Sequence, residues 1–341
     1  MNKLFLLIIM LTMVTCANAA KNDDKTSPVN LTGVSNKTIS GYTINLDGSK
    51  TVGIYLHNCD HIRITDCRIM NSENMGIRLD NCSDIIIENC FVSDVSVGIY
   101  AFRCTGGIKV NNNEVMDMVG PFVKDNKLIG LGAHIQFNSC TGGGNQINYN
   151  KCQTTIAEGN NPNERTGDNI SLYKSSGIPG DPIQVYHNKI KGGGTSTGSF
   201  GAGGIIAGDS GGDWQDVEYN TVVDCGYAGI QQHGGSNNII RHNTILLNNK
   251  PWSGAGLVVA NYSGAPSANN TVSDNTVNCF AGKFNTQRDT VYKPGSGNSA
   301  MERPKGWETN VVKAKIDLRV LPDQLISPKN LLKRVKRSEK N

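Results

Sequence analysis

The chain has 341 residues, with 39 glycines, only 6% aromatic residues and a formal net charge of +4 at pH 7. This composition is typical of many short strands and turns, and it argues against a protein built from large helices. The charge is unevenly placed, because residues 301–341 hold eleven Lys or Arg against five acids, which leaves a nearly neutral body of 22 basic and 24 acidic residues.

The first segment, residues 1–19, has a basic start, an apolar run over 4–14 and a small-residue ending at Ala17 and Ala19. This pattern is typical of a secretory signal peptide, and we predict cleavage after Ala19. The alternative is a lipoprotein in which Cys16 carries the lipid. No later apolar run approaches the roughly twenty residues that span a bilayer, so we expect a secreted or periplasmic protein without a membrane span.

Two short sequence patterns return along the rest of the chain. Copies of the first pattern are GIYLHNC (53–59), GIRLDNC (76–82), GIYAFRC (98–104), HIQFNSC (134–140), NISLYKS (169–175), GIIAGDS (204–210), GIQQHGG (229–235) and GLVVANY (256–262). Copies of the second pattern are ITDCRI (64–69), IENCFV (87–92), VNNNEV (110–115), INYNKC (147–152), VYHNKI (185–190), VEYNTV (217–222), IRHNTI (240–245) and VSDNTV (272–277). The first pattern starts anew after 23, 22, 36, 35, 35, 25 and 27 residues.

A period near 22 to 25 residues, built from short strands that cannot bury their own apolar face, is typical of a solenoid. No helical period separates the strands. The pattern therefore predicts an all-β protein, a right-handed parallel β-helix of about 8–10 coils, in preference to a leucine-rich repeat. Because side chains alternate along a strand, Ile77 and Leu79 are expected to point into the core.

Stacked coils place equivalent residues above one another. The fourth position of the second pattern becomes an internal column of Cys67, Cys90, Asn113, Asn150, Asn188, Asn220, Asn243 and Asn275. We expect its amides to bond one another. Another inward column holds Cys59, Cys82, Cys104 and Cys140. Ten cysteines in a secreted chain would suggest a disulfide framework, but we interpret most of them as small buried hydrophobic residues and leave the disulfide state open.

We expect the β-helix to occupy residues 20–284, with an imperfect first coil at 27–52. Residues 285–341 lose the repeat and are predicted to form a capping segment, which would cover exposed strand edges, followed by the basic tail. The tail at 329–341 could touch nucleic acid or an anionic surface. A solvated or helical terminal segment is the simpler interpretation, so we expect no nucleic-acid partner.

Both patterns resemble the parallel β-helix repeats of secreted polysaccharide lyases and hydrolases, over residues 53–277. The stretch DNISLYKSSG (168–177) is most similar to the small single-domain β-helix alginate lyases. The Gly-His-Gly and Arg-Ile-Lys elements of the polygalacturonases are absent, as is the Trp-Ile-Asp-His element of the classical pectate lyases. The resemblance implies β-elimination on an acidic polysaccharide, with alginate as the first candidate, although a fold alone does not fix an activity.

The longer central periods contain insertions at 119–133, 156–168 and 190–203. Long loops on a rigid scaffold often form the walls of a binding site, so we expect the site on the outward side chains of these coils. Aromatic and amide groups suit sugars, and cations suit their carboxylates. The predicted substrate-binding residues are Arg78, Tyr100, Gln136, Asn138, Arg165, Gln231 and His233. The alternative is an ordinary polar face of a soluble β-helix.

Elimination needs a group that neutralises the uronate carboxylate, a base for the C5 proton and an acid for the departing O4. Arg165, Gln136 and Asn138 are our candidates for the carboxylate. Tyr173 and Lys174 lie at the centre of the strip and are residue types able to serve as base or acid, and the identity of the base stays open. His134 and His233 are reserve bases, because histidine titrates near neutral pH.

Two other functions fit the same sequence. A glycoside hydrolase would use paired carboxylates, for which Asp209, Asp213 and Asp181 are the available set. A non-catalytic glycan-binding protein would use the strip without an acid and a base. We expect no cofactor, and calcium is possible although no calcium-loop pattern occurs. We also expect a monomer whose partner is the acidic polysaccharide.

Overall fold

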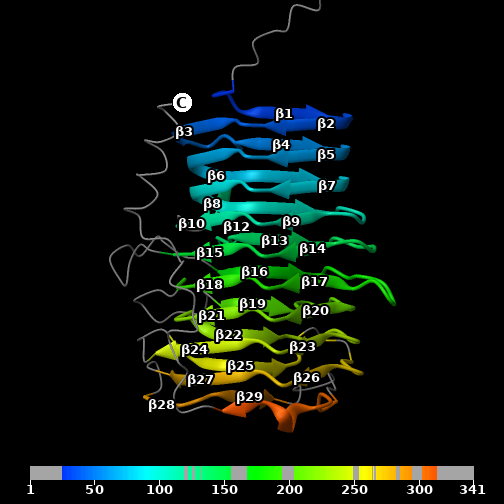
Figure 1. The fold of residues 1–341 in the computed structure, drawn as a ribbon, viewed down its shortest axis with the longest axis vertical. Helices are drawn as coiled ribbons and strands as arrows, with labels where there is room; N and C mark the ends of the chain where they lie inside the picture. Colours follow the sequence, from blue (N-terminus) through cyan, green and yellow to red (C-terminus); the bar gives the residue numbers. More distant parts are fainter. Residues whose placement is uncertain are drawn as a thin grey trace, which may run out of the picture.

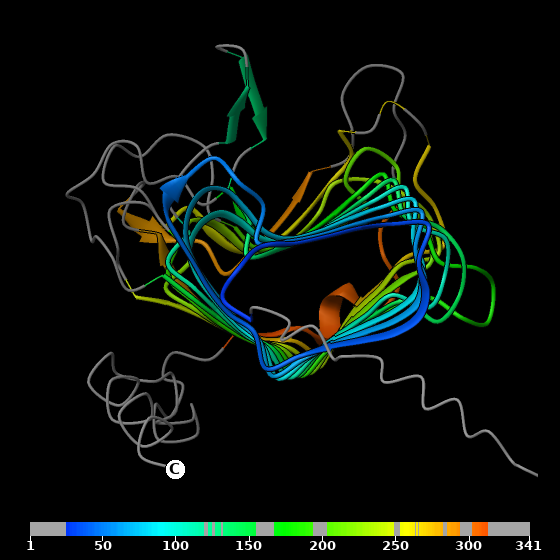
Figure 2. The ribbon, with the colours of Figure 1, turned by 90° about the horizontal axis from the view of Figure 1, so that it is seen from above.

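The computed structural model describes residues 25–118, 122–124, 127–130, 132–154, 167–193, 203–248, 253–262, 264, 266–281, 285–293 and 302–312. Nearly all regular structure in these residues is β-strand, stacked coil upon coil along one axis (Figure 1). Viewed along that axis, the coils superpose around a shared interior (Figure 2). The strands pair almost entirely in parallel, and parallel crossovers are right-handed. The chain is therefore a right-handed parallel β-helix, as the repeats predict.

Three ladders of parallel strands run along the solenoid. Ladder 1 contains β1 (Val29–Thr32), β4 (Ile54–His57), the second halves of β6 (Arg68–Asp80) and β8 (Phe91–Phe102), β13 (Ile135–Asn138), β16 (Asp168–Tyr173), β19 (Gly203–Ala207), β22 (Tyr227–Gln232), β25 (Ala255–Ala260) and β29 (Thr290–Lys293). Ladder 2 contains β2 (Ser35–Ser40), β5 (Asp60–Thr65), β7 (Ser83–Glu88), β9 (Lys109–Asn111), β14 (Gln146–Asn148), β17 (Ile183–Tyr186), β20 (Gln215–Glu218), β23 (Ile239–Arg241) and β26 (Thr271–Ser273).

Ladder 3 contains β3 (Thr43–Ser49), the first halves of β6 and β8, β10 (Glu114–Met116), β15 (Lys151–Gln153), β18 (Lys189–Lys191), β21 (Thr221–Val223), β24 (Thr244–Asn248), β27 (Thr276–Ala281) and β30 (Val311–Val312). Ladders 1 and 3 join because β6 and β8 continue through the corner between them. The other elements are the hairpin β11 (Phe122–Lys124) and β12 (Lys127–Gly130), β28 (Thr286–Gln287), which is antiparallel to β27, and the 3₁₀ helix η1 (Trp307–Thr309).

The first repeated pattern forms the core face of ladder 1. Its aliphatic second position stacks in register as Ile54, Ile77, Ile99, Ile135, Ile170, Ile205, Ile230 and Leu257. These side chains have no exposed surface, and the same holds for Leu79 two residues after Ile77. Alternation along each strand therefore sends the neighbouring positions outward, where they are free to carry function.

A buried column of asparagines ties the coils together between ladders 2 and 3. From Asn150 onward each amide oxygen accepts two hydrogen bonds from the asparagine one coil earlier, as Asn188 Oδ1 does from the backbone and side-chain nitrogens of Asn150 at 2.9 and 3.0 Å. The Asn188 amide also donates to the Ile147 carbonyl at 2.7 Å. The predicted column from Asn113 onward is confirmed, and it extends to Asn310. Because buried amides must find partners, the column fixes the register of the coils it crosses.

The nine cysteines among the described residues are all free and buried. The predicted inward stack from Cys59 to Cys140 is confirmed. In the next coil Ser175 replaces cysteine, and its hydroxyl accepts a hydrogen bond from the Cys140 backbone at 3.0 Å. These thiols therefore act as small core residues, which confirms that interpretation for the described part of the chain. Cys16 lies outside it.

Glycine opens the first pattern because the chain turns a crowded corner there. A Cβ atom at Gly53 would collide with the Ile69 side chain and would lie 2.8 Å from the Gly76 carbonyl oxygen of the next coil. Asn169 takes this position in a later coil, and its amide donates to the Gly203 carbonyl at 2.9 Å. His134 takes it one coil before that, with its side chain fully enclosed.

Both ends of the solenoid depart from the repeat without leaving the ladders. β1, β2 and β3 form the imperfect first coil expected near residues 27–52. At the other end, β29 pairs with β25 and β30 pairs with β27, so the ladders continue to residue 312, past the boundary expected at 284. Tyr292 and Trp307 pack against this end of the core. The expected signal peptide and basic tail lie outside the described residues, within which no helix is long and apolar enough to cross a bilayer.

Candidate functional site

The outward residues of ladder 1 form a continuous strip in the predicted register. Its first row is Tyr55, Arg78, Tyr100, Gln136, Ser171, Ile206 and Gln231, and its second row is His57, Asp80, Phe102, Asn138 and Tyr173. Neighbours within a row lie one coil apart, about 4.8 Å. An extended polymer lying along the solenoid axis would therefore meet successive coils at the spacing of these rows, with the more exposed side chains between Tyr55 and Tyr173.

Arg78 forms an ion pair with Asp80 on its own strand. Its guanidinium donates to both oxygens of Asp80 at 2.8 to 3.1 Å, and the Tyr55 hydroxyl donates to the same carboxylate at 2.8 Å. The guanidinium also lies 6.0 Å from the centre of the Tyr100 ring. Asp80 therefore neutralises the cation, so this end of the strip offers aromatic surface and hydroxyl groups more than net positive charge.

Gln136 and Asn138 occupy the middle of the strip on β13. The Asn138 amide donates to the Tyr100 hydroxyl at 3.0 Å, and the Gln136 amide donates to the Ser171 hydroxyl at 3.4 Å. Both amides are half-buried and are held between adjacent coils. They are positioned to donate to an anionic group on the strip in exchange for one of these bonds.

An acidic side chain that the sequence did not single out lies at the start of β16. The Asp168 carboxyl accepts a hydrogen bond from Gln231, two coils away, with 3.0 Å between Oδ1 and Nε2. Gly203 stands between them, and a Cβ atom there would lie only 2.5 Å from Asp168 Oδ1 and 2.7 Å from Gln231 Nε2. The absence of a side chain at Gly203 therefore makes this contact between β16 and β22 possible.

Burial, with a smaller contribution from the negative charge of Asp209, raises the pKa of the Asp168 carboxyl to about 7, against hydrogen bonds from Gly203 and Gln231 that lower it. Burial also raises the pKa of Asp209, while Ser210 and the positive charge of Lys174 lower it. The charge of Asp209 thus acts on Asp168, and the charge of Lys174 acts on Asp209. Shifted acids grouped with a cation in this way are typical of functional sites.

Tyr173 and Lys174 lie at the other end of β16 from Asp168, next to Asp209 in the following coil. The Lys174 ammonium is 5.2 Å from the centre of the Tyr173 ring, and the Lys174 backbone donates to the Asp209 carbonyl at 2.9 Å. Tyr173 is half-buried and Lys174 is exposed. The central cluster, which we define as Asp168, Tyr173, Lys174, Asp209 and Gln231, therefore combines a phenol, an ammonium group, two acids and an amide.

Of the two candidate histidines, His134 is fully enclosed and His233 is half-buried. Burial lowers the pKa of both His134 and His233 to about 4, so both rings are neutral at neutral pH. His134 lies at the corner position, with no exposed surface and no hydrogen-bond partner on either ring nitrogen. His233 packs edge-on against Tyr262, with ring centres 4.9 Å apart. His134 is therefore not placed on the outward rows.

The aspartates proposed for a hydrolase do not meet as a set. Asp213 accepts a hydrogen bond from the Ser236 backbone at 2.6 Å, which fits the turn that its sequence also suggested. Asp181 lines a groove on ladder 2, away from the strip. Asp209 is near Asp168 instead. Arg165 lies outside the described residues, and no group of three or more metal-binding side chains occurs within them.

A family model described as a right handed beta helix region matches residues 14–126, about a third of the chain. No curated protein matches the sequence.

Several solved structures share the architecture at low identity. DFA-IIIase from Arthrobacter chlorophenolicus A6 is 14% identical with a TM-score of 0.44, over 69% of this chain and 54% of that one. An α-1,3-glucanase from Streptomyces thermodiastaticus is 15% identical with a TM-score of 0.38, over 83% and 51%. An alginate lyase from Paenibacillus is 13% identical with a TM-score of 0.45, over 80% and 88%. The chain thus spans about half of the first two, and these likenesses concern the backbone fold alone.

Proposed function

We propose that this protein is an extracytoplasmic polysaccharide lyase that cleaves a uronic acid polymer on the strip of ladder 1, and that alginate is the first substrate to test. The supporting observation is the central cluster. Its phenol, its ammonium group and a carboxyl whose pKa is about 7 come from β16 and the residue that follows it. Each of these groups has a task in β-elimination.

The carboxylate of the substrate must be neutralised first, because negative charge develops next to it when the C5 proton leaves. With its pKa raised to about 7 by burial, Asp168 is protonated in a large fraction of molecules at neutral pH. A protonated carboxyl can donate to the uronate carboxylate, where an ionised one would repel it. Gln136 and Asn138 supply further amide donors one coil away.

Proton transfer falls to the residues at the end of β16. Tyr173 takes the C5 proton, the C4–O4 bond breaks with its electron pair going to O4, and a double bond forms between C4 and C5. Lys174 lies beside the Tyr173 ring and near Asp209. Its positive charge stabilises negative charge on the phenol oxygen, and the ammonium group is the donor that protonates the departing O4.

The rest of the strip provides binding contacts in this proposal. Tyr100 and Asn138, joined by a hydrogen bond, offer ring surface and an amide to a sugar on one side of the cluster. Gln231 holds Asp168 in place, and His233 directly follows β22. The roles of His134 as a reserve base and Arg165 as a carboxylate contact stay predictions from the sequence.

Hydrolysis is the second candidate, and the electrostatic coupling of Asp168 and Asp209 favours it specifically. A hydrolase uses two carboxyl groups, of which one is protonated and the other is ionised. The raised pKa of Asp168 suits the protonated acid, and the cation near Asp209 suits the ionised carboxylate. The two chemistries differ in their products, since only elimination leaves an unsaturated uronate.

The mature protein should therefore be incubated with alginate, polygalacturonate, hyaluronate and chondroitin, each with and without a chelator. Absorbance near 235 nm and new reducing ends are both followed. A lyase gives both signals together on at least one polymer. New reducing ends without absorbance would support the hydrolase, and binding without either signal would support a non-catalytic glycan-binding protein.

A further inference from the structure

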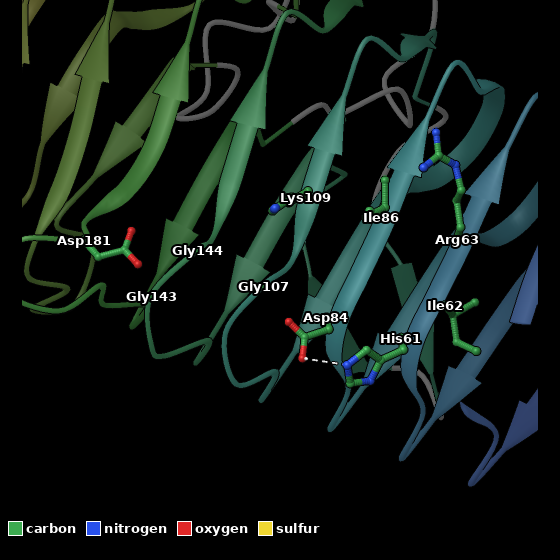
Figure 3. A pocket seen from close by; sticks show the side chains of 10 residues that line it. All are labelled: His61, Ile62, Arg63, Asp84, Ile86, Gly107, Lys109, Gly143, Gly144 and Asp181. Carbon is green, nitrogen blue, oxygen red and sulfur yellow. Dashed lines mark ion pairs between the residues drawn. The ribbon is translucent and has the colours of Figure 1, made fainter. Parts of the chain in front are cut away.

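The outer face of ladder 2 has a groove that the proposed lyase site does not use. Its volume is about 560 Å³, within the range of small-molecule sites, and it crosses the coils of β5, β7, β9, β14 and β17 (Figure 3). Every residue that lines it belongs to the described part of the chain.

Two carboxylates converge over the middle of this groove from its two ends. Asp84 on β7 leans over Gly107 of the next coil, and Asp181, just before β17, leans back over Gly143 of the preceding coil (Figure 3). A Cβ atom on either glycine would overlap a carboxylate oxygen. The two glycines are also joined to each other, because the Gly107 backbone nitrogen donates a hydrogen bond of 2.9 Å to the Gly143 carbonyl oxygen.

Gly143 has no conformational reason to be glycine. Its neighbours Gly142 and Gly144 have φ angles of 91° and 74°, in the left-handed region, whereas Gly143 is not among the residues with positive φ. Any residue could adopt its backbone conformation, but a side chain would collide with Asp181. The missing side chain therefore serves to keep the Asp181 carboxylate in the groove.

A cationic side chain stands between the two carboxylates. Lys109 on β9 is in register with Ile86 on β7, and Ile86 is in register with Arg63 on β5. Arg63 is paired with Glu88, and Asp84 lies 3.8 Å from the His61 ring. By contrast, no side-chain hydrogen bond or ion pair within the described residues engages Lys109 or Asp181. One free cation and one free carboxylate thus face the groove, beside the aliphatic surface of Ile86.

We propose that this groove is a second, non-catalytic binding site for one or two uronate residues of the polymer. The uronate carboxylate pairs with Lys109, and sugar hydroxyls donate to Asp181 and Asp84. The Ile86 side chain offers apolar surface to the face of a sugar ring beside these polar groups. The choice of a uronate over another sugar rests on the proposed function, whereas the site itself does not.

The groove and the strip lie on different ladders, so one polymer chain occupying both would be held to the solenoid away from the point of cleavage. Binding at the second site raises the local concentration of substrate at the first. The groove should therefore affect long polymers and leave the turnover of short oligosaccharides unchanged.

The test is calorimetric titration of a uronate trisaccharide into the Tyr173→Phe chain, with and without a second change of Lys109→Ala or Asp181→Asn. Lys191→Ala and Asp47→Asn, at exposed positions outside the groove, are the matched controls. We expect the stoichiometry to fall by one site, or the affinity of one site to weaken at least about tenfold, in the groove variants only.

The expected difference in binding between the parent chain and the groove variants does not depend on catalysis. If the lyase proposal fails and the strip binds nothing, the parent still binds one trisaccharide and the groove variants bind none. Unchanged stoichiometry and affinity in the groove variants would overturn the inference, as would a parent chain that binds no uronate at all. A folded sample is confirmed for each variant from its far-UV circular dichroism.

Discussion

Gln231 donates a hydrogen bond of 3.0 Å to Asp168 across an intervening coil, and Gly203 leaves the space through which the two side chains meet. A buried carboxyl is thereby held on the outward strip by a residue more than sixty positions away in the sequence. The proposed chemistry depends on this contact, because it holds an acid with a raised pKa at the start of the strand that ends at Tyr173.

Gly203→Ala should abolish most of the activity while the protein stays folded. The new Cβ atom would lie 2.5 Å from the Asp168 carboxylate and 2.7 Å from the Gln231 amide, so both must move. We expect kcat to fall at least about a hundredfold, as displacement of catalytic groups by about 1 Å commonly does. Gly143→Ala is the matched control, since it also displaces a carboxylate but on ladder 2. Equal turnover of oligosaccharides by wild type and Gly203→Ala would contradict the role of the contact.

The activity should fall as the pH rises through about 7, because burial raises the pKa of Asp168 to about 7 and its protonated form is the proposed donor. Asp168→Asn keeps a neutral hydrogen-bonding group, so its kcat/KM should lose this descending limb. The pH profiles of the two proteins provide the measurement. An identical descending limb in both would show that another group titrates.

The same carboxyl should make folding less favourable at high pH. A carboxyl whose pKa rises on folding, here from an ordinary 3.8 to about 7, holds its proton more tightly in the folded protein, so stability falls as the pH rises between these values. Asp168→Asn should therefore gain melting temperature relative to wild type between pH 4 and 7. Burial raises the pKa of Asp216 to about 7 as well, so Asp216→Asn shows how much of the slope arises on ladder 2. A constant difference at all pH values would contradict the assignment.

Asn188→Ala should cost about 3 kcal/mol or more of the free energy of unfolding. The change leaves the Asn150 backbone N–H and the Ile147 carbonyl buried without their partner. Urea unfolding followed by circular dichroism gives the value. Asn310→Ala, at the partly buried end of the column, should cost less, and equal losses at both positions would mean that the column does not carry the stability assigned to it.

The cysteines should be unreactive in the folded protein. All nine in the described residues are free and enclosed, so a thiol reagent should modify them only after unfolding, and a reductant should leave the melting temperature unchanged. A drop in melting temperature on reduction would reveal a disulfide and contradict this state.

The sequence predicted the fold well because each coil repeats the same physical requirement. Aliphatic residues such as Ile77 recur in every coil because each strand must bury one face. Asparagines such as Asn188 recur because each buried amide needs a hydrogen-bond partner in the next coil. Beyond residue 284, the pairing of β29 and β30 uses backbone groups and leaves no repeated residue in the sequence to read.

The site was harder to predict because its contacts cross coils. The central position of Tyr173 and Lys174 followed from the strip, but Asp168 did not, since it lies before the repeat and its importance depends on Gly203 and Gln231. The sequence signal that could have found it is the acid at the start of DNISLYKSSG together with a glycine in the same position one coil later. His134 is the opposite case. The sequence singled it out because it replaces the usual glycine of the first pattern, but the structure encloses its side chain at the corner.

The most direct test of the central claim is the initial rate of absorbance change at 235 nm on the preferred polymer for Tyr173→Phe and Lys174→Ala. Tyr219→Phe and Lys191→Ala, which remove the same groups from exposed positions on other faces, are the controls. The account predicts that both cluster variants lose at least about a hundredfold in kcat while both controls keep the wild-type rate. Wild-type rates in the two cluster variants would contradict it and would place the chemistry elsewhere on the solenoid.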